Sequence, residues 1–326
     1  MTRALALLSG GLDSILSAKL IKEQGIDVIG ICFKSYFFAE RNAERMVSQI
    51  GIPLKVIDIS EEHFKMIENP KHGYGKNMNP CIDCHAMMLR LAGGLLEEMD
   101  ADFLITGEVL NQRPMSQRRD ALDIVKNESL YKDKILRPLS AKLLPPTKME
   151  EDGLVDRERL LGLSGRGRKE QMAMAEAWDI RDYPSPAGGC ALTEPNYANR
   201  LRELLSHDKN PLEKDILLLK VGRHFRVTDG AKIISARDAK EAEIMKSLIN
   251  ENDLVFQAKD YNGSMVVIVG KATENDIEFA GRVTGRYSKG KDEDSIAVRY
   301  GFFKKSYDFK LEVKKTSDEE LQKYII

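Results

Sequence analysis

Short apolar runs alternate with amphipathic segments along the first 140 residues of the chain. Continuous apolar runs of this length are typical of buried strands, and apolar residues at spacings of three and four are typical of one helix face. The runs that we expect to form strands are residues 4–8, 26–33, 52–59, 102–109 and 135–139. Strands that alternate with helices predict an α/β fold with a doubly wound parallel sheet, in which ligands lie beyond the carboxyl ends of the strands.

The pattern changes after the proline pair at residues 145 and 146, where residues 156–161 and 169–178 predict two helices. Beyond about residue 206 the apolar runs become shorter and are separated by turn residues. The expected strands there are residues 216–221, 225–227, 232–235, 254–258 and 265–269, with one helix at 239–249. We therefore expect two domains, residues 1–205 and a smaller α+β domain at 206–326.

A glycine-containing turn, Ser9-Gly10-Gly11-Leu12-Asp13-Ser14, follows the first strand and precedes the first helix. A helix N-terminus carries unpaired N–H groups and positive partial charge, and glycines let a phosphate approach the backbone closely. Ser9 and Ser14 can add hydroxyl donors, while Asp13 can bind a metal ion or cap the helix. An ordinary strand–turn–helix connection is the alternative. The usual P-loop and dinucleotide patterns are absent from this turn.

Further polar residues are expected at the same edge of the sheet. Phe33 ends the second strand, where an adenine ring could lie, and Gly107 follows the fourth strand. Gln112 and Arg113 come shortly afterwards and can reach the same crevice. A basic, glycine-rich turn at residues 164–169 is suited to phosphate contact or is a solvated loop.

The chain has four cysteines among 326 residues, too few for a disulfide framework. Cys32 lies within an apolar strand and is expected in the core. Cys81 and Cys84 are three residues apart at the start of a predicted helix, and Cys190 follows a turn rich in proline and glycine. Together with His85 they could form a closed structural Zn²⁺ site, whereas three thiolates alone suit an iron–sulfur cluster with one open iron.

The composition and net charge of the chain limit the classes of protein to which it can belong. Hydrophobic residues make up 42% and charged residues 31% of the chain, and the formal net charge is −1. With no signal-peptide pattern and no apolar run that could span a bilayer, we expect a cytoplasmic protein without a membrane partner. A nucleic-acid surface would have to be local. Residues 282–315 hold ten basic and five acidic residues interleaved with aromatic ones, which suits either RNA contact or a solvated face over core aromatics.

The string from Ser9 to Ser14 resembles the PP-loop of the ATP pyrophosphatase superfamily, whose adenine nucleotide α-hydrolase-like members split ATP between its α and β phosphates. Other strings extend the resemblance to the tRNA thiouridine synthetases, most closely to the 4-thiouridine synthetase-like branch. They are Asn79-Pro-Cys-x-x-Cys-His85, Gln112-Arg-Pro-Met-Ser-Gln117 and Pro186-Ala-Gly-Gly-Cys190. The C-terminal part, through Val221-Gly-Arg-His-Phe-Arg226, is similar to the RNA-binding NFACT-R module.

This resemblance implies that ATP adenylates a uridine carbonyl oxygen of tRNA and that sulfur then replaces it, favouring 4-thiouridine. The resemblance assigns Ser9, Gly10, Gly11 and Ser14 to phosphate binding, and Asp13 to Mg²⁺ or loop geometry. It assigns Phe33 and Gly107 to the adenosine pocket, and Gln112 and Arg113 to phosphoryl charge or uracil. Related cluster-dependent enzymes hold a 4Fe–4S cluster with three cysteines, which implies Cys81, Cys84 and Cys190. Free sulfide or a cysteine desulfurase would donate the sulfur.

Several alternatives stay open at this point. A persulfide on Cys190 with Cys84 as the resolving thiol would resemble the 2-thiouridine enzymes. A non-catalytic RNA-binding protein with structural zinc would use the same cysteines without chemistry. Thiolation of a small molecule instead of tRNA, or amide synthesis of the kind performed by other superfamily members, is a further possibility.

Overall fold

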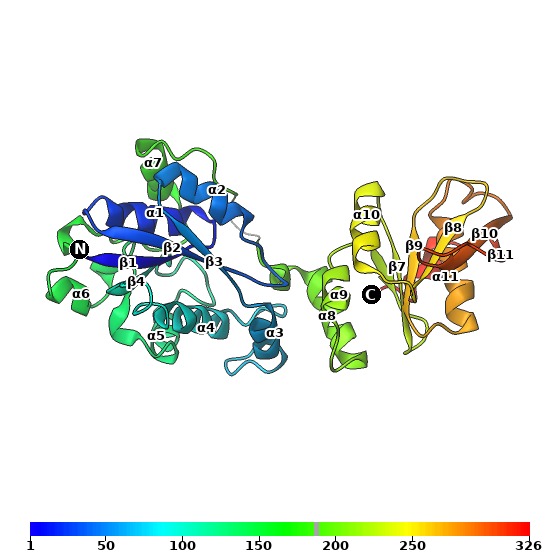
Figure 1. Cartoon of the computed structure of the whole chain (residues 1–326), viewed down its shortest axis with the longest axis horizontal. Coiled ribbons are helices and arrows are strands. Elements are labelled where there is room, and N and C mark those ends of the chain that lie inside the picture. The colour runs from blue at the N-terminus through cyan, green and yellow to red at the C-terminus, as the bar shows by residue number, and fades with distance from the viewer. Residues whose placement is uncertain (186–188) are drawn as a thin grey trace. The chain divides into compact units, whose positions relative to one another are not determined.

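The computed structural model describes residues 1–185 and 189–326 and divides them into two compact units, Met1–Thr193 and Glu194–Ile326 (Figure 1). The predicted boundary lay after residue 205. Helix α8 (Pro195–His207) instead belongs to the second unit, where the Tyr197 hydroxyl donates to the Ile216 carbonyl and Arg200 donates to the Leu219 carbonyl. None of the helices in these residues is long and apolar enough to cross a membrane.

The first unit is built on a five-stranded sheet with the order β3-β2-β1-β4-β5, and its neighbouring strands run parallel. The strands are β1 (Arg3–Leu7), β2 (Asp27–Lys34), β3 (Leu54–Asp58), β4 (Phe103–Thr106) and β5 (Ile135–Leu136). The doubly wound α/β class is confirmed. The order reverses direction between β1 and β4, so ligands are expected at the carboxyl ends of these two strands.

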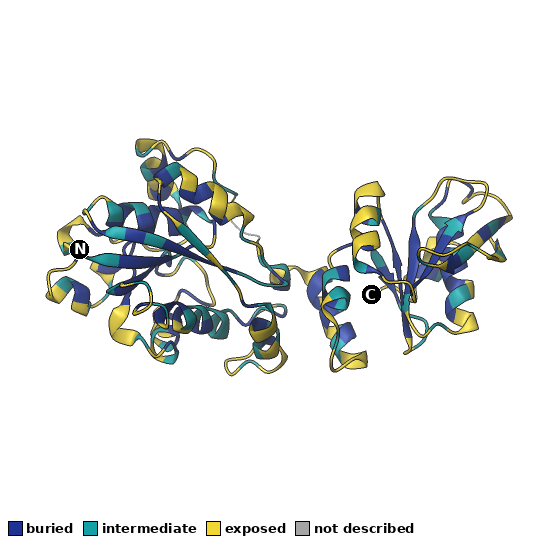
Figure 2. Cartoon of the chain, viewed as in Figure 1, coloured by how far each residue is buried: buried dark blue, intermediate teal, exposed yellow. Residues whose placement is uncertain are grey.

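Helices cover both faces of this sheet, because side chains of successive strand residues point to opposite sides. Ala4 and Ala6 of β1 pack in one apolar cluster, and Leu5 between them packs in another. The helices are α1 (Leu12–Lys22), α2 (Arg41–Ile50), α3 (Ser60–Glu68), α4 (Cys81–Gly93), α5 (Arg119–Glu128), α6 (Lys148–Glu151) and α7 (Lys169–Ala177). Residues of α1, α2 and α7 join the first cluster, and residues of α4 join the second. Figure 2 shows the sheet as the buried layer between these helices.

Two details of the first unit differ from the prediction or refine it. The helix predicted at 156–161 is only a single 3₁₀ turn, Arg157–Arg159, because the backbone N–H groups of Leu161 and Leu163 bond to the segment after β5 instead. Cys32 is 1% exposed in the core, and burial raises the pKa of its thiol to about 12. The prediction that Cys32 serves packing is confirmed.

The second unit contains a six-stranded antiparallel sheet with the order β11-β10-β8-β9-β7-β6. Its strands are β6 (Arg223–Phe225), β7 (Ala231–Ser235), β8 (Leu254–Ala258), β9 (Val266–Gly270), β10 (Ser295–Phe302) and β11 (Phe309–Lys314). Its helices after α8 are α9 (Glu213–Leu218), α10 (Ala239–Leu248), α11 (Glu274–Arg286) and α12 (Asp318–Gln322). The predicted α+β domain is therefore present. The strand predicted at 216–221 is wrong, since α9 covers its first half.

Candidate active site

The turn after β1 exposes helical N–H groups at the switch point of the sheet. Gly11 is the N-cap of α1, and no side chain caps the helix. Gly10 has a φ of 75°, and a Cβ there would lie 2.6 Å from the backbone N of Ala43 in α2. The Ser14 hydroxyl donates to the Gly11 carbonyl at 2.8 Å, whereas Ser9 is exposed. Ser9 Oγ accepts from Gly11 N at 3.4 Å, but no side chain in the described residues accepts from the N–H groups of the first turn of α1. These donors are therefore available, as a phosphate site requires.

Gly107 closes the gap between β4 and this turn. A Cβ at Gly107 would lie 2.4 Å from both the backbone N and the Cα of Ser14, a contact that only glycine permits. One helical turn further along, the Ser17 hydroxyl donates to the Thr106 carbonyl at 2.9 Å. The predicted phosphate turn and the end of β4 are thus in direct backbone contact.

Asp13 is held by a short chain of side-chain amides. Gln112 Nε2 donates to Asp13 Oδ2 at 2.6 Å, and Gln171 Nε2 of α7 donates to Gln112 Oε1 at 3.1 Å. The other carboxylate oxygen, Asp13 Oδ1, is buried and accepts no hydrogen bond from any residue that the structure describes. A buried carboxylate oxygen without a partner, beside a phosphate-binding turn, is chemically suited to Mg²⁺.

A buried ion-pair network follows directly after Gly107. Glu108 is 7% exposed and accepts from Arg137 Nε at 2.8 Å and from His85 Nδ1 at 3.1 Å. Burial opposes the charge on Glu108, but the positive charge of Arg137 and the hydrogen bond from His85 outweigh it and lower its pKa to about 2. The ionised carboxylate fixes the proton of His85 on Nδ1, and it ties the first turn of α4 to the end of β4.

The three predicted thiols lie in one region. Cys81 and Cys84 begin α4, and the Asn79 side-chain amide donates to Cys81 Sγ at 3.2 Å. The segment after Cys190 reaches the same loop, since Met78 N donates to the Leu192 carbonyl at 3.3 Å. Burial raises the pKa of Cys84 well above its usual value, and the negative charges that Cys190 and Cys81 would carry raise it further. The pKa of Cys190 is raised to about 11, chiefly by burial.

Whether these thiols could hold a metal group depends on their ligand chemistry and on their placement. Three soft thiols that interact electrostatically form a donor set suited to iron–sulfur or zinc. In residues 1–185 and 189–326, however, no three His, Cys, Asp or Glu side chains are placed to hold a metal ion. The predicted turn at 186–188, just before Cys190, lies outside the described residues. The ligand chemistry therefore fits, while the described residues do not form a preformed metal site.

The remaining predicted residues have different surroundings. Phe33 is 6% exposed and packs in the core cluster of α4, so its side chain has little surface for an adenine ring. Arg113 is exposed near Gln112. The basic turn at 164–169 lies beside the same loop, because Gly165 N donates to the Leu110 carbonyl at 2.8 Å. The roles assigned to these residues from the sequence stay predictions.

Three residues that contribute to this site had no role in the sequence-based prediction. Glu108 and Arg137 form the buried ion pair, and Gln171 supports Gln112 from α7. One signal was available for Arg137, a charged residue inside the apolar run of the fifth strand. A charge buried in a strand requires a partner, which points to an acidic residue at the same sheet edge.

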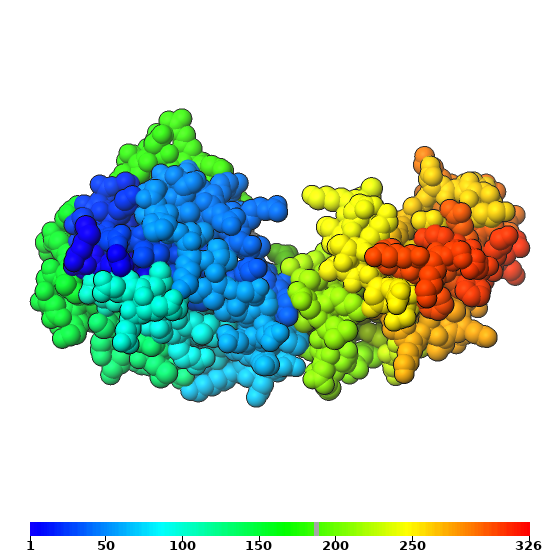
Figure 3. All heavy atoms as spheres, in the orientation of Figure 1, coloured from blue at the N-terminus to red at the C-terminus, as the bar shows by residue number. Residues whose placement is uncertain are grey.

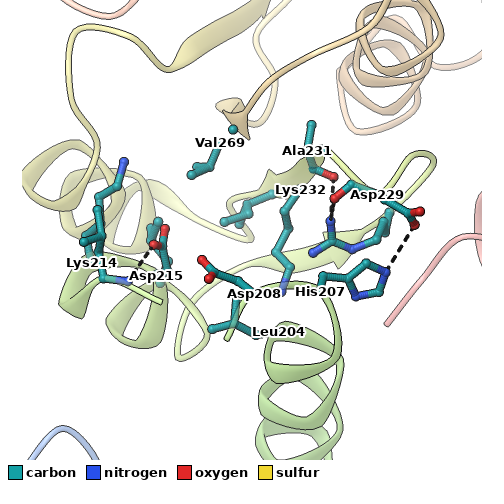
Figure 4. Close-up of a pocket in the computed structure, with 15 residues that line it drawn as sticks. Leu204, His207, Asp208, Lys214, Asp215, Asp229, Ala231, Lys232 and Val269 are labelled. Carbon is teal, nitrogen blue, oxygen red and sulfur yellow. Dashed lines mark hydrogen bonds and ion pairs between the residues drawn. The ribbon is translucent and has the colours of Figure 1, made fainter. Parts of the chain in front are cut away.

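The second unit contains a separate cavity of about 370 Å³ between α8, α9 and the β6–β7 hairpin (Figure 4). Its basic groups already have acidic partners. Lys232 Nζ lies 2.7 Å from Glu203 Oε2, and His207 Nε2 lies 3.4 Å from Asp229 Oδ1. Arg226 also pairs with Glu203. These contacts leave the cavity without the unpaired cations that a phosphate-binding site needs.

The strand–glycine turn–helix arrangement at the β1–β4 switch point defines a PP-loop type of nucleotide-binding domain. The comparisons with known proteins agree: residues 1–142 match the family described as "Thiamine biosynthesis protein (ThiI)". Residues 222–325 match the family described as "NFACT protein RNA binding domain". The N-terminal unit is therefore similar to the ThiI family over residues 1–142, and most of the second unit is similar to the NFACT-R family. Both resemblances stated from the sequence are confirmed.

Curated relatives carry the name tRNA-specific 2-thiouridylase MnmA. One from Clostridium botulinum (strain Eklund 17B / Type B) is 24% identical over 78% of this chain and 79% of its own length. A second, from Clostridium botulinum (strain Langeland / NCTC 10281 / Type F), is 31% identical over 52% of each chain. Among solved structures, a 4-thiouridine synthetase–RNA complex with bound ATP is 18% identical, with a TM-score of 0.36 over 55% of this chain and 52% of that one.

The first testable prediction concerns Gly107. In Gly107→Ala the new Cβ, 2.4 Å from the Ser14 backbone, forces the end of β4 away from the phosphate turn. We expect the free energy of unfolding to fall by about 1–3 kcal/mol and ATP affinity to fall with it. Urea unfolding and calorimetric ATP titration measure both. Gly162→Ala is the control, because its Cβ would lie 3.5 Å from the nearest atom. Wild-type ATP affinity in Gly107→Ala would contradict this account of the site.

The second prediction concerns pH. The pKa of Glu108 in the folded protein, about 2, lies below its ordinary value of 4.5, so its stabilisation is complete above pH 4.5 and is lost as pH falls toward 2. Glu108→Gln leaves the buried Arg137 without a counter-charge, and we expect a loss of about 3–5 kcal/mol at pH 7. Urea unfolding from pH 7 to pH 2.5 should show the difference between wild type and variant shrinking only below pH 4.5. The exposed Glu97→Gln serves as control, and a difference that is constant with pH would contradict the ion-pair assignment.

Proposed function

We propose that this chain is an ATP-dependent tRNA sulfurtransferase, which adenylates a uridine carbonyl oxygen and replaces it with sulfur. The observation that carries the proposal is the short path of contacts from the phosphate turn to the thiols. Gly107 touches the Ser14 backbone, its neighbour Glu108 holds His85, and His85 follows Cys84. This path links the glycine turn after β1 to the thiols at the start of α4, and consecutive adenylation and sulfur transfer would require such proximity.

The activation step follows from the residues of the turn. A uridine carbonyl oxygen leaves poorly, but its attack on the α-phosphate of ATP forms an adenylate and releases pyrophosphate. The free N–H groups of α1, with Gly10 and Gly11, bind phosphate oxygens, and Ser9 can add a hydroxyl donor. Asp13, positioned by Gln112, would hold Mg²⁺ through Oδ1. Arg113 carries positive charge toward the phosphates, so the protein's contribution is positioning and charge stabilisation.

The sulfur step involves Cys81, Cys84 and Cys190. Sulfur attacks the activated carbon of the pyrimidine ring, and AMP leaves with the former carbonyl oxygen. When bound by the three thiolates, a 4Fe–4S cluster supplies an open iron at which a sulfur atom can be held. At neutral pH the raised pKa values keep Cys84 and Cys190 protonated, so ligation would release their protons. Free sulfide or a cysteine desulfurase is the proposed source of sulfur.

A second candidate is the 2-thiouridine type of enzyme, favoured by the names of the curated relatives. The hydrogen bond from Met78 N to the Leu192 carbonyl, which brings the segment of Cys190 to the loop before α4, also favours it. In this route the terminal sulfur of a Cys190 persulfide attacks the activated carbon, and AMP leaves. Cys84 then attacks Cys190 Sγ, which frees the thiouridine and leaves a Cys84–Cys190 disulfide for an external thiol to reduce. Nucleoside mass spectrometry distinguishes 4-thiouridine, which the sequence resemblance favours, from 2-thiouridine.

The third prediction tests adenylation. Purified protein with ATP, Mg²⁺ and unmodified tRNA should release AMP and pyrophosphate, and Asp13→Asn should lower that rate by about 100-fold or more, because a charge at the phosphates is lost. Asp123→Asn, at an exposed position of α5, is the matched control. AMP release is measured by chromatography with and without tRNA. A protein that binds tRNA but never forms AMP would instead be the non-catalytic RNA-binding alternative.

The fourth prediction concerns the thiols. Anaerobically purified protein should contain stoichiometric iron and acid-labile sulfide, and Cys81→Ala, Cys84→Ala and Cys190→Ala should each abolish thiolation. Cys32→Ala should retain thiolation, since Cys32 is a core residue. The route through a Cys190 persulfide predicts a different result. The protein would contain no iron, Cys81→Ala would retain full thiolation, and mass spectrometry would find a persulfide on Cys190. Stoichiometric zinc without activity would contradict both routes.

A further inference from the structure

The hairpin formed by β10 and β11 presents aromatic side chains at the edge of the second sheet. Because β11 is an edge strand, one side of it has no neighbouring strand. Phe302 at the end of β10 is 40% exposed, and Phe309 at the start of β11 is 48% exposed. Large rings are costly to leave in water, and two exposed rings on one hairpin are typical of an interaction surface.

Phe309 continues a stack of rings that begins in the core. The centre of the Phe256 ring lies 4.8 Å from that of Tyr300, with an interplanar angle of 7°. The centre of the Tyr300 ring lies 5.2 Å from that of Phe309, with an interplanar angle of 24°. Tyr300 and Phe309 are directly paired across the two strands, and Phe302 follows Tyr300 by two residues on the same face. The buried end fixes the orientation of the stack, and its exposed end is a rigid aromatic surface that an additional flat ring can extend.

Positive charge surrounds this aromatic surface. Lys305 Nζ lies 5.5 Å from the centre of the Phe302 ring, and Lys304 Nζ lies at the same distance from Phe303. Arg299 and Lys310, paired in register on the other face of the hairpin, add two more charges. None of these four cations forms an ion pair with a residue in the described part of the chain. The nearby acid Asp308 accepts a hydrogen bond from Ser306.

Lysines on an edge strand also prevent strand-to-strand aggregation, which explains part of this pattern. That explanation does not account for Phe302 and Phe309, since exposed rings on an edge favour association. A ligand that offers flat rings and negative charge at once satisfies both features. Nucleotides of unpaired RNA have this chemistry, whereas paired bases are stacked within a duplex and cannot reach the rings.

We propose that the β10–β11 hairpin binds unpaired nucleotides of the RNA substrate. Bases stack on Phe302 and Phe309, and Lys304 and Lys305 bind the flanking phosphates. The inference deepens the proposed function, since it rests on an RNA substrate and locates where that RNA is held. Tyr287, one of the aromatic residues within the basic segment 282–315, is excluded from the surface, because it is half-buried with Arg223 over its ring at 4.5 Å.

The experiment uses the full chain and fluorescence anisotropy with an unstructured single-stranded RNA, the matching RNA duplex and unmodified tRNA. We expect Phe302→Ala and Phe309→Ala each to weaken single-strand binding by about tenfold or more, because each removes one base-stacking contact. The double variant Lys304→Asn/Lys305→Gln should reduce the slope of log affinity against log salt by about 1.4. Asparagine suits position 304, where φ is 60°.

Tyr261→Ala and Lys240→Gln are the controls. Tyr261 is an exposed ring beside the opposite end of β10 from Phe302, and Lys240 is an exposed cation on α10. Circular dichroism and thermal unfolding verify that each variant folds. Wild-type affinity in both phenylalanine variants, equal loss in the controls, or a change of oligomeric state in place of RNA affinity would overturn the inference. AMP release is measured in parallel, so the two proposals fail separately. If the phenylalanine variants lose RNA binding but the wild-type protein releases no AMP, only the proposed function is overturned. If the wild-type protein thiolates tRNA but the variants bind RNA with unaltered affinity, only the role of the hairpin is overturned.

Discussion

The contact between Gly107 and the backbone of Ser14 is the constraint on which the candidate site depends. A Cβ on residue 107 would lie 2.4 Å from the Ser14 nitrogen, so no side chain fits there. Glycine at this position lets β4 end directly beside the predicted phosphate turn after β1. This contact places Glu108 at the crevice, where it forms an ion pair with Arg137 and accepts a hydrogen bond from His85. Because His85 lies near the N-terminus of α4, its hydrogen bond to Glu108 holds the cysteine-bearing helix next to the predicted phosphate turn. The proposed chemistry follows from that sequence of contacts.

Much of the first unit could be predicted from the sequence. Apolar strands followed by glycine turns and amphipathic helices have few alternatives, so the parallel sheet and the turn from Ser9 to Ser14 were predicted correctly. The site was harder, because the pattern cannot show which distant side chains meet. The pairing of Asp13 with Gln112 and of Glu108 with Arg137 depends on strand order, and strand order is a property of the whole sheet.

The second unit was predicted less well, for physical reasons. The run at 216–221 has apolar residues at nearly every position, so its periodicity does not distinguish a strand from the helix α9 that it joins. Helix α11 was missed although Thr273 and Asp276 form a capping box at its start. In β10 and β11 the alternation is obscured by exposed rings and lysines. Those are the same residues that the RNA inference assigns to binding, and local pattern rules are expected to fail at such sites.

The central claim is that one crevice first activates the uridine oxygen with ATP and then exchanges that oxygen for sulfur. Isotope transfer tests this claim most directly. A tRNA is prepared with ¹⁸O at the carbonyl of the target uridine and is incubated anaerobically with the protein, ATP and a sulfur source. The account predicts that mass spectrometry finds the ¹⁸O in the phosphate of the released AMP, in amounts equal to the thiouridine formed. Thiolated tRNA accompanied by unlabelled AMP would contradict it.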